Sequence, residues 1–125
     1  MLKELNNFFY LHERKIKINK KNGNLSGNDN LIPKLTSNIS VNTYNIRFHL
    51  YPSITAVQTM AKNSILIQIE KGKSLIFTST ADNIILEKSI FLGRNQIINN
   101  FCITVAGTLN NNENKNIIWE FKKNN

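Results

Sequence analysis

The sequence has one cysteine, Cys102, among its 125 residues. A single thiol cannot form an internal disulfide, and it excludes a metal site built from several cysteines. Because Cys102 lies in an apolar run, we expect it to be a small buried side chain. Long apolar runs are also missing, since no stretch approaches the roughly 20 residues of a membrane-spanning helix. The short apolar run at the N-terminus is followed by charges, unlike a secretory signal. We therefore expect no membrane partner, and the sequence leaves the cellular location unknown.

Acidic residues are few: 8 Asp and Glu stand against 16 Lys and Arg, which gives a net charge of +8. Such a charge attracts polyanions, including nucleic acid and acidic polysaccharide. The basic residues fall into separate groups near residues 15–21, 71–73 and 122–123. A solvated basic surface is therefore the plainer interpretation. Aromatic residues are not interleaved with the basic ones, which counts against a nucleic-acid-binding sheet.

Apolar and polar residues alternate along most of the chain, which is the repeat of a strand with one buried face. The clearest runs cover residues 15–19, 46–51, 65–70, 101–106 and 117–122, with less regular ones at 74–78 and 84–91. Turns rich in Gly, Asn and Asp separate them. We expect seven or eight short strands in one all-β domain over residues 1–125, as an antiparallel sandwich or barrel. Residues 1–5 alone could form a short helical remnant.

The strand pattern begins by about Phe8, with no lead-in. A sheet that starts so early is often the continuation of a longer one. If strands were missing upstream, an unpaired edge would be exposed, and such an edge invites aggregation or pairing with a partner.

Three polar side chains, Arg47, His49 and Tyr51, are predicted to share the polar face of one strand. A cation, an imidazole and a phenol side by side could bind a carboxylate and move a proton. The same pattern also fits an ordinary exposed strand face, and the residues alone favour that interpretation.

The other histidine, His12, is most simply explained as an exposed turn or strand-end residue paired with Glu13. No carboxylate or cysteine stands at metal-ligand spacing from either histidine, so no metal site is predicted. Gly27 and Asp29 are predicted to form a structural turn. There glycine would supply a positive φ and aspartate would cap the turn with its side chain.

Several segments occur in one order along the chain: LHERKIKI at 11–18, GNLSGND at 23–29, IRFHLYP at 46–52, LEKSIFLG at 86–93, QII at 96–98 and IIWEFKK at 117–123. This series resembles the last part of the heparinase II/III-like family of bacterial polysaccharide lyases. The resemblance covers about residues 8–123. Its most specific parts are the Arg-Phe-His-Leu-x-Pro segment and the Ser-x-x-Leu-Gly segment that follows it.

The resemblance implies a fold and a reaction. Members of the family join an N-terminal toroid of helices to a C-terminal antiparallel β-sandwich, and they cleave uronic-acid-containing polysaccharides by β-elimination, with tyrosine and histidine moving the proton. The toroid, and the early sandwich strands with a catalytic histidine and a metal site, would lie upstream of Met1. We therefore expect a partial, C-terminal β-sandwich, with little or no activity alone and no cofactor of its own. Acidic polysaccharide and a separately encoded helical half would be its partners. The family typically works in the periplasm or outside the cell.

The resemblance also bears on single residues. His49 matches a histidine that recurs in this strand of the family, so it is the one catalytic candidate, although a structural or substrate-facing role is equally open. Tyr51 stands where similar sequences often have a second histidine, which weakens the idea of a metal pair. The candidate substrate-binding residues are Arg47, His49, Tyr51, Arg14 and His12. The alternatives are a non-catalytic module for acidic glycans and, third, a basic nucleic-acid-binding β-domain.

Overall fold

The computed structural model describes residues 2–4, 10–33, 43–93, 96–110 and 113–124. All regular structure in these residues is β-strand, as the alternating pattern predicts. The strands are β1 (Leu2–Glu4), β2 (Tyr10–Ile18), β3 (Leu25–Pro33), β4 (Thr43–His49), β5 (Thr55–Gln58), β6 (Ile65–Glu70), β7 (Lys73–Ser79), β8 (Asn83–Gly93), β9 (Gln96–Thr108) and β10 (Lys115–Lys123). The expectation of a helical remnant at residues 1–5 was wrong for residues 2–4, because β1 pairs with β2 in register from Leu2↔Glu13 to Glu4↔Leu11. Residues 1 and 5 lie outside the described part of the chain.

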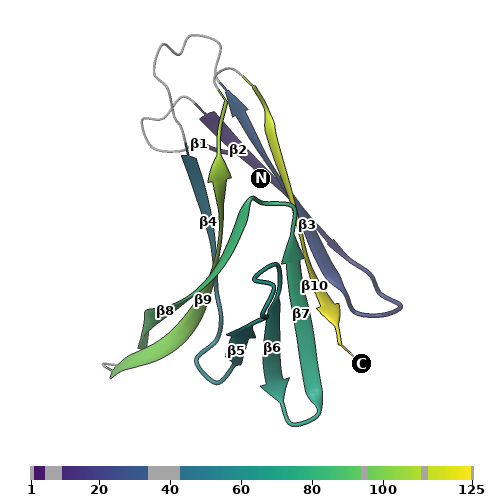
Figure 1. Cartoon of the computed structure of the whole chain (residues 1–125), viewed down its shortest axis with the longest axis vertical. Coiled ribbons are helices and arrows are strands. Elements are labelled where there is room, and N and C mark those ends of the chain that lie inside the picture. Colours follow the sequence, from purple (N-terminus) through teal and green to yellow (C-terminus); the bar gives the residue numbers. More distant parts are fainter. Residues whose placement is uncertain (1, 5–9, 34–42, 94–95, 111–112, 125) are drawn as a thin grey trace.

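The strands form two antiparallel sheets that face each other (Figure 1). The larger sheet has the order β1-β2-β3-β10-β7-β6-β5, and the smaller has the order β4-β9-β8. This arrangement confirms the all-β sandwich. Two tight turns occur where the sequence predicts them, with Gly23 and Gly72 at φ values of 76° and 80°. Glycine adopts such values without steric penalty.

The core lies between the sheets and has a cluster of four aromatic rings at its centre. The Phe48 ring lies 4.9 Å from Trp119 and 5.4 Å from Phe77, centroid to centroid, and Phe77 lies 4.8 Å from Phe121. Phe48 comes from β4 and the other three from β7 and β10, so these contacts join the two sheets. Tilted and edge-on ring pairs of this kind are favourable beyond the area they bury. Trp119 is a core residue, and Phe48 and Phe121 pack against the core. The fully or nearly buried residues around them include Leu31, Ile65, Ile67, Ile103, Val105 and Ile117.

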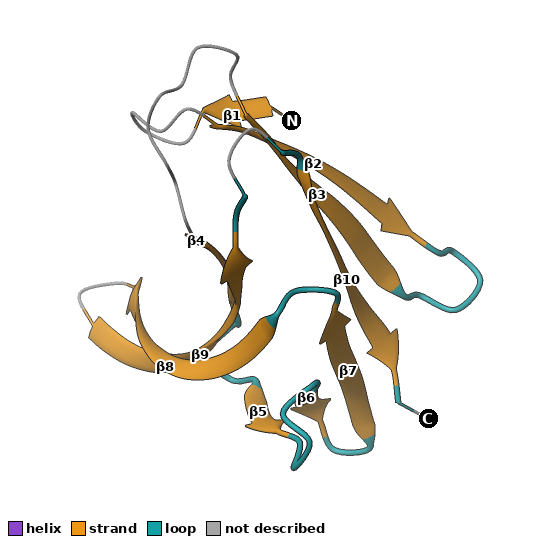
Figure 2. Ribbon diagram, turned by 45° about the horizontal axis from the view of Figure 1, so that its top comes forward, coloured by secondary structure: helices purple, strands orange, loops and turns teal. Residues whose placement is uncertain are grey.

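The smaller sheet covers only part of the larger one. Its β8 side lies near β5, where Gln58 Nε2 donates to the carbonyl oxygen of Ile84 at 2.6 Å. Its β4 side lies toward β2, where the guanidinium of Arg14 stands 5.2 Å from the centre of the Phe48 ring. The long β8–β9 hairpin bends strongly away from the larger sheet (Figure 2). Within the described residues, no helix is long and apolar enough to span a membrane.

Candidate functional site

A buried carboxylate, Asp29, is the centre of the most elaborate polar cluster in the described part of the chain. Asp29 is fully buried, with 0% of its surface exposed. Asp29 Oδ1 accepts a bond from Arg14 Nε at 2.7 Å and lies 3.0 Å from His12 Nε2. Its Oδ2 accepts from Arg14 Nη2 at 3.1 Å and from the indole Nε1 of Trp119 at 2.9 Å. Both oxygens therefore have two partners each.

Strand pairing brings these residues together. β3 is paired on one side with β2, where Arg14 is opposite Asp29, and on the other with β10, where Trp119 is opposite Gly27. Side chains two residues apart on a strand share a face, so His12 and Arg14 both point to the side of Asp29. Three segments that are far apart in the sequence thus meet at one carboxylate.

Gly27 and Asp29 lie in the middle of β3, so the prediction that they form a turn was wrong. Gly27 is not among the glycines with positive φ. Its lack of a side chain serves another purpose, because a Cβ placed there would lie 2.0 Å from Cζ2 of Trp119. The glycine lets the indole lie flat over β3 and reach Asp29. The misreading has a physical reason, since Gly, Asn and Asp favour turns unless tertiary contacts select a strand.

The electrostatics of the cluster keep Asp29 ionised. Burial pushes the pKa of this carboxyl upward, but the bonds from Arg14, His12 and Trp119, together with the charge of Arg14, outweigh burial and leave the pKa below its ordinary value of 3.8. Arg14 is further held by the rings of Phe48 and Trp119, at 5.2 and 5.6 Å from their centres. A carboxylate with filled acceptor positions and a low pKa is a poor general base. Asp29 instead holds the side chains of His12, Arg14 and Trp119 in place.

The expected pairing of His12 with Glu13 was also wrong, since His12 contacts Asp29 instead. His12 and Arg14 remain partly exposed, at 17% and 31% of their side chains. Any contact that His12 or Arg14 makes with a substrate would be made from a position fixed by Asp29.

Arg47 and His49 lie on β4 and are exposed on the outer face of the smaller sheet. They alternate with the inward-facing Ile46 and Phe48, as the sequence predicts. Tyr51 is 66% exposed, but it lies two residues beyond the end of β4, so it does not continue that strand face. The structure therefore brings together two of the three residues expected to share it.

The outer face beside Arg47 and His49 has a feature that the sequence did not reveal. The pairing of β4, β9 and β8 places Thr104 opposite Arg47, and Cys102 between His49 and Glu87. Thr104 Oγ1 donates to Glu87 Oε1 at 2.7 Å. Cys102 and Thr104 are both buried at 2% exposure, although they point away from the core. The prediction of a buried Cys102 is confirmed. Glu87 was missed because only the strand register brings it near this row.

Within the described residues, no group of three or more His, Cys, Asp or Glu side chains is arranged to hold a metal ion. Asp29 and His12 do not form part of such a site, because the carboxylate oxygens are already bonded to Arg14 and Trp119. A metal ion placed there would also be repelled by the guanidinium.

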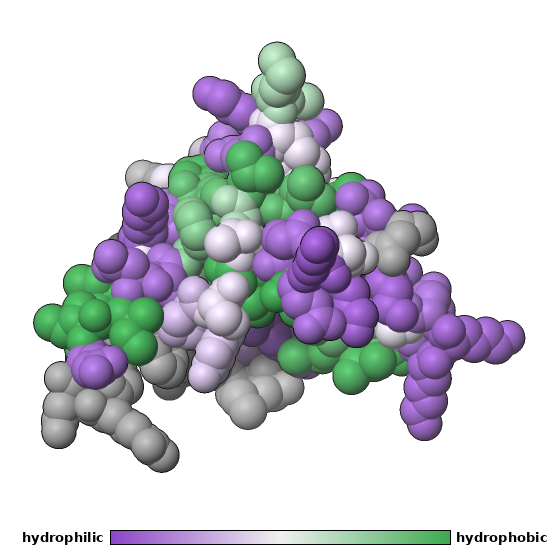
Figure 3. Space-filling model, turned by 90° about the horizontal axis from the view of Figure 1, so that it is seen from below, coloured by the Kyte–Doolittle hydropathy of each residue, from purple (hydrophilic) through white to green (hydrophobic). Residues whose placement is uncertain are grey.

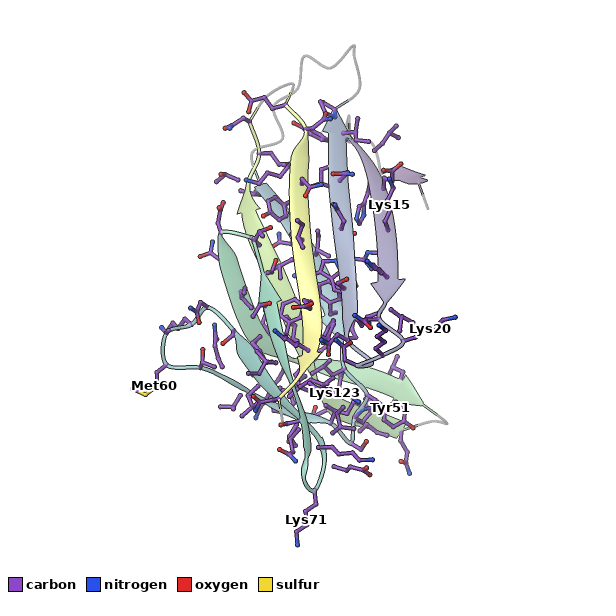
Figure 4. All side chains as sticks on the ribbon, turned by 90° about the vertical axis from the view of Figure 1, so that its right-hand side faces the viewer. Lys15, Lys20, Tyr51, Met60, Lys71 and Lys123 are labelled. Atoms are coloured by element: carbon purple, nitrogen blue, oxygen red, sulfur yellow. The ribbon has the colours of Figure 1, made fainter. Side chains whose placement is uncertain are left out.

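The basic side chains are spread over the molecule. Figure 4 shows Lys15, Lys20 and Lys71 pointing outward from different elements. Lys123, which is also labelled, lies beside the β2–β3 turn that carries Lys20, since a Cβ on Gly23 would be 3.4 Å from Lys123 Nζ. Lys15 and Lys71 point outward elsewhere.

Comparisons with known proteins gave one match. A family model described as "Heparinase II/III-like, C-terminal" matches residues 6–120, which is nearly the whole chain. Neither the search of curated proteins nor that of solved structures found a match.

Proposed function

Because the chain belongs to the heparinase II/III-like family, through the C-terminal domain of that family, we propose that it forms the β-sandwich part of a polysaccharide lyase. The substrate would be an acidic polysaccharide that contains uronic acid, cleaved by β-elimination. The observation that carries the proposal is the family match over residues 6–120, which includes both His12 and the Arg47–His49 strand.

The reaction sets requirements that can be compared with the residues present. The uronate carboxylate must be neutralised, a base must remove the adjacent ring proton, and the glycosidic oxygen must leave with a proton. Arg47 suits the first task, because a guanidinium binds a carboxylate through two parallel hydrogen bonds. His49, two residues along the same exposed face, is the candidate for proton transfer or for substrate contact.

A complete acid–base system requires more than this face provides. Within the described residues, no hydrogen bond joins His49 to a second titratable side chain, and His12 is engaged by Asp29. We therefore propose that this part of the enzyme is inactive alone. A helical half would supply the tyrosine and the long substrate cleft, and the sandwich would contribute Arg47 and His49 at its edge.

The proposal is tested by measuring binding and cleavage separately. The purified chain is titrated with polygalacturonate, alginate and heparan sulfate, and unsaturated uronate is followed by its ultraviolet absorbance. We expect one of these polymers to bind without cleavage, and an Arg47→Ala/His49→Ala double variant to bind it more weakly. A Lys71→Ala variant is the control, because it removes a cation from the β6–β7 turn of the other sheet. Equal binding by all three proteins would remove the Arg47–His49 face from the proposal.

A non-catalytic module for acidic glycans is the second candidate. The net charge of +8 favours it, because that charge attracts a polyanion without any catalytic group. The two candidates differ when a helical half of the same family is added. Unsaturated product in the mixture supports the lyase, whereas binding without product in every combination supports the module. Nucleic acid remains the third candidate, and it rests on charge alone.

A further inference from the structure

One edge of the smaller sheet is open along β4. In the order β4-β9-β8, β4 has β9 on one side, and within the described residues no strand pairs with its other side. The amide of Leu50 donates to the carbonyl oxygen of Phe101 at 2.9 Å, which continues the β4–β9 ladder. Bonded pairs recur at every second residue of an antiparallel ladder. The backbone groups of Asn45, Arg47 and His49 therefore face the open edge.

The inner face of β2 is uncovered at two apolar residues. Ile16 and Ile18 lie on the same face of β2 as Arg14, which points toward the core, yet they are 59% and 64% exposed. Apolar side chains at the inner face of a sandwich are normally covered by the opposite sheet. Here the smaller sheet ends before it reaches them.

The open edge and the uncovered residues lie on the same side of the sandwich and at the same level. Strand register aligns Ile16 with Gly27 and Trp119, and Ile18 with Leu25 and Phe121. Phe48 of β4 packs on Trp119 and Phe121, at 4.9 and 5.9 Å between ring centres. In Figure 4, β10, β3 and β2 follow one another from left to right, so β2 is the next strand outward from those that Phe48 contacts. A strand added beside β4 would therefore lie over Ile16 and Ile18.

We propose that this side of the sandwich binds an extended segment of a partner polypeptide, which pairs with β4 as a fourth strand of the smaller sheet. Main-chain hydrogen bonds to Asn45, Arg47 and His49 would hold it, as in other cases of strand addition. Its inward side chains would be apolar, because they cover Ile16 and Ile18. Its outward side chains would be acidic, because they lie beside Arg47 and His49, and opposite charges on neighbouring strands attract.

The inference does not depend on the proposed function, since the surface requires no polysaccharide. It also uses Arg47 and His49 mainly through their backbone. If the protein binds glycan but no peptide strand, only the strand proposal fails. If it binds a peptide strand but no glycan, only the proposed function fails.

The test uses amide hydrogen exchange on the full chain with a capped probe peptide in which valine alternates with glutamate. In the free chain, the amides of Asn45, Arg47 and His49 should exchange rapidly, while those of Ile46 and Phe48 are protected by β9. The probe should slow exchange of the three edge amides by about tenfold or more at saturation. No slowing of the edge amides at the highest soluble peptide concentration overturns the proposal. Protection of these amides in the monomeric free chain does the same.

Two comparisons identify what binds. An Ile16→Ser/Ile18→Ser double variant should weaken peptide binding by about tenfold or more, because two apolar contacts are lost. Ile118→Ser is the matched control, since Ile118 is exposed on the outer face of β10 and should leave binding unchanged. A peptide with lysine in place of glutamate should bind more weakly than the acidic one. Edge protection that grows with protein concentration, together with a dimer mass by light scattering, would assign the surface to a second copy and overturn the proposal.

Discussion

The indole ring of Trp119 occupies the space in which Gly27 would otherwise carry a side chain. The contact is so close that a Cβ on Gly27 would lie 2.0, 2.3 and 2.6 Å from three ring carbons. Both residues lie within paired strands, β3 and β10, so neither backbone is free to move apart. The same placement brings the indole nitrogen to Asp29. The side chain of Trp119 therefore both packs against Gly27 and donates a hydrogen bond to Asp29.

Gly27→Ala is expected to destabilise the fold. The added methyl group forces Trp119 away from β3, and overpacking of this kind costs about 1–3 kcal/mol. The displaced indole should also lose its bond to Asp29. Chemical denaturation measures the free energy of unfolding, and tryptophan fluorescence reports the change around the ring. An unchanged stability and spectrum would show that the strands separate more easily than the contact implies.

Asp29→Ala is expected to lower the free energy of unfolding by about 3 kcal/mol, because it removes the buried carboxylate to which Arg14 and the indole nitrogen donate. Asp29→Asn should be milder, since one amide oxygen remains. The matched control is Glu70→Gln in the β6–β7 hairpin, where Glu70 pairs with Lys73 in full solvent, and it should leave stability unchanged.

The stability of the wild-type chain should depend on pH through the same carboxylate. The pKa of Asp29 is lower in the folded chain than its ordinary value of 3.8, because the bonds from Arg14, His12 and Trp119 outweigh burial. A lowered pKa contributes stability above the unfolded value, and that stability is lost as the pH falls through the folded value. Urea titrations below pH 4 should therefore show a steeper loss for the wild type than for Asp29→Asn. Parallel acid profiles for the two proteins would contradict this assignment.

Cys102 provides a probe of the outer face of the smaller sheet. Its thiol is buried at 2% exposure between its strand neighbours His49 and Glu87, so it should react only when that face opens. We expect a thiol reagent to modify the native chain at least about a hundredfold more slowly than the chain in denaturant. Because the sequence has no other cysteine, the signal comes from this residue alone. Equal rates would mean that the face is open in solution.

The β8–β9 hairpin should limit solubility. Its inward-facing Ile90, Leu92 and Ile97 are exposed, and apolar surface reaches the left-hand end of the molecule in Figure 3, where this hairpin lies. Exposed apolar surface on a projecting hairpin promotes association. Ile90→Ser/Ile97→Ser should raise the solubility limit while leaving the melting temperature nearly unchanged. Lys71→Ser, in another exposed turn, is the control, and a parallel gain there would exclude the hairpin as the cause.

The sequence alone predicted the fold better than the polar cluster. Period-two alternation located most of the strands, because a strand with one buried face needs only local pattern to be recognised. The Asp29 cluster depends on the register between β2, β3 and β10, which no local pattern contains. Gly27 and Asp29 even appeared as a turn, since their intrinsic preferences favour one. Arg14 and Trp119 could have indicated the cluster, because a buried carboxylate requires hydrogen-bond donors such as a guanidinium and an indole.

The position of β10 has a consequence for how the chain acquires its shape. β10 is the last strand in sequence, yet it lies in the middle of the larger sheet and pairs with both β3 and β7. Until residues 115–123 leave the ribosome, the β1–β3 and β5–β7 portions have no strand to join them. Assembly of the larger sheet therefore waits for that segment, and synthesis interrupted before Lys115 would leave the two three-stranded portions unjoined.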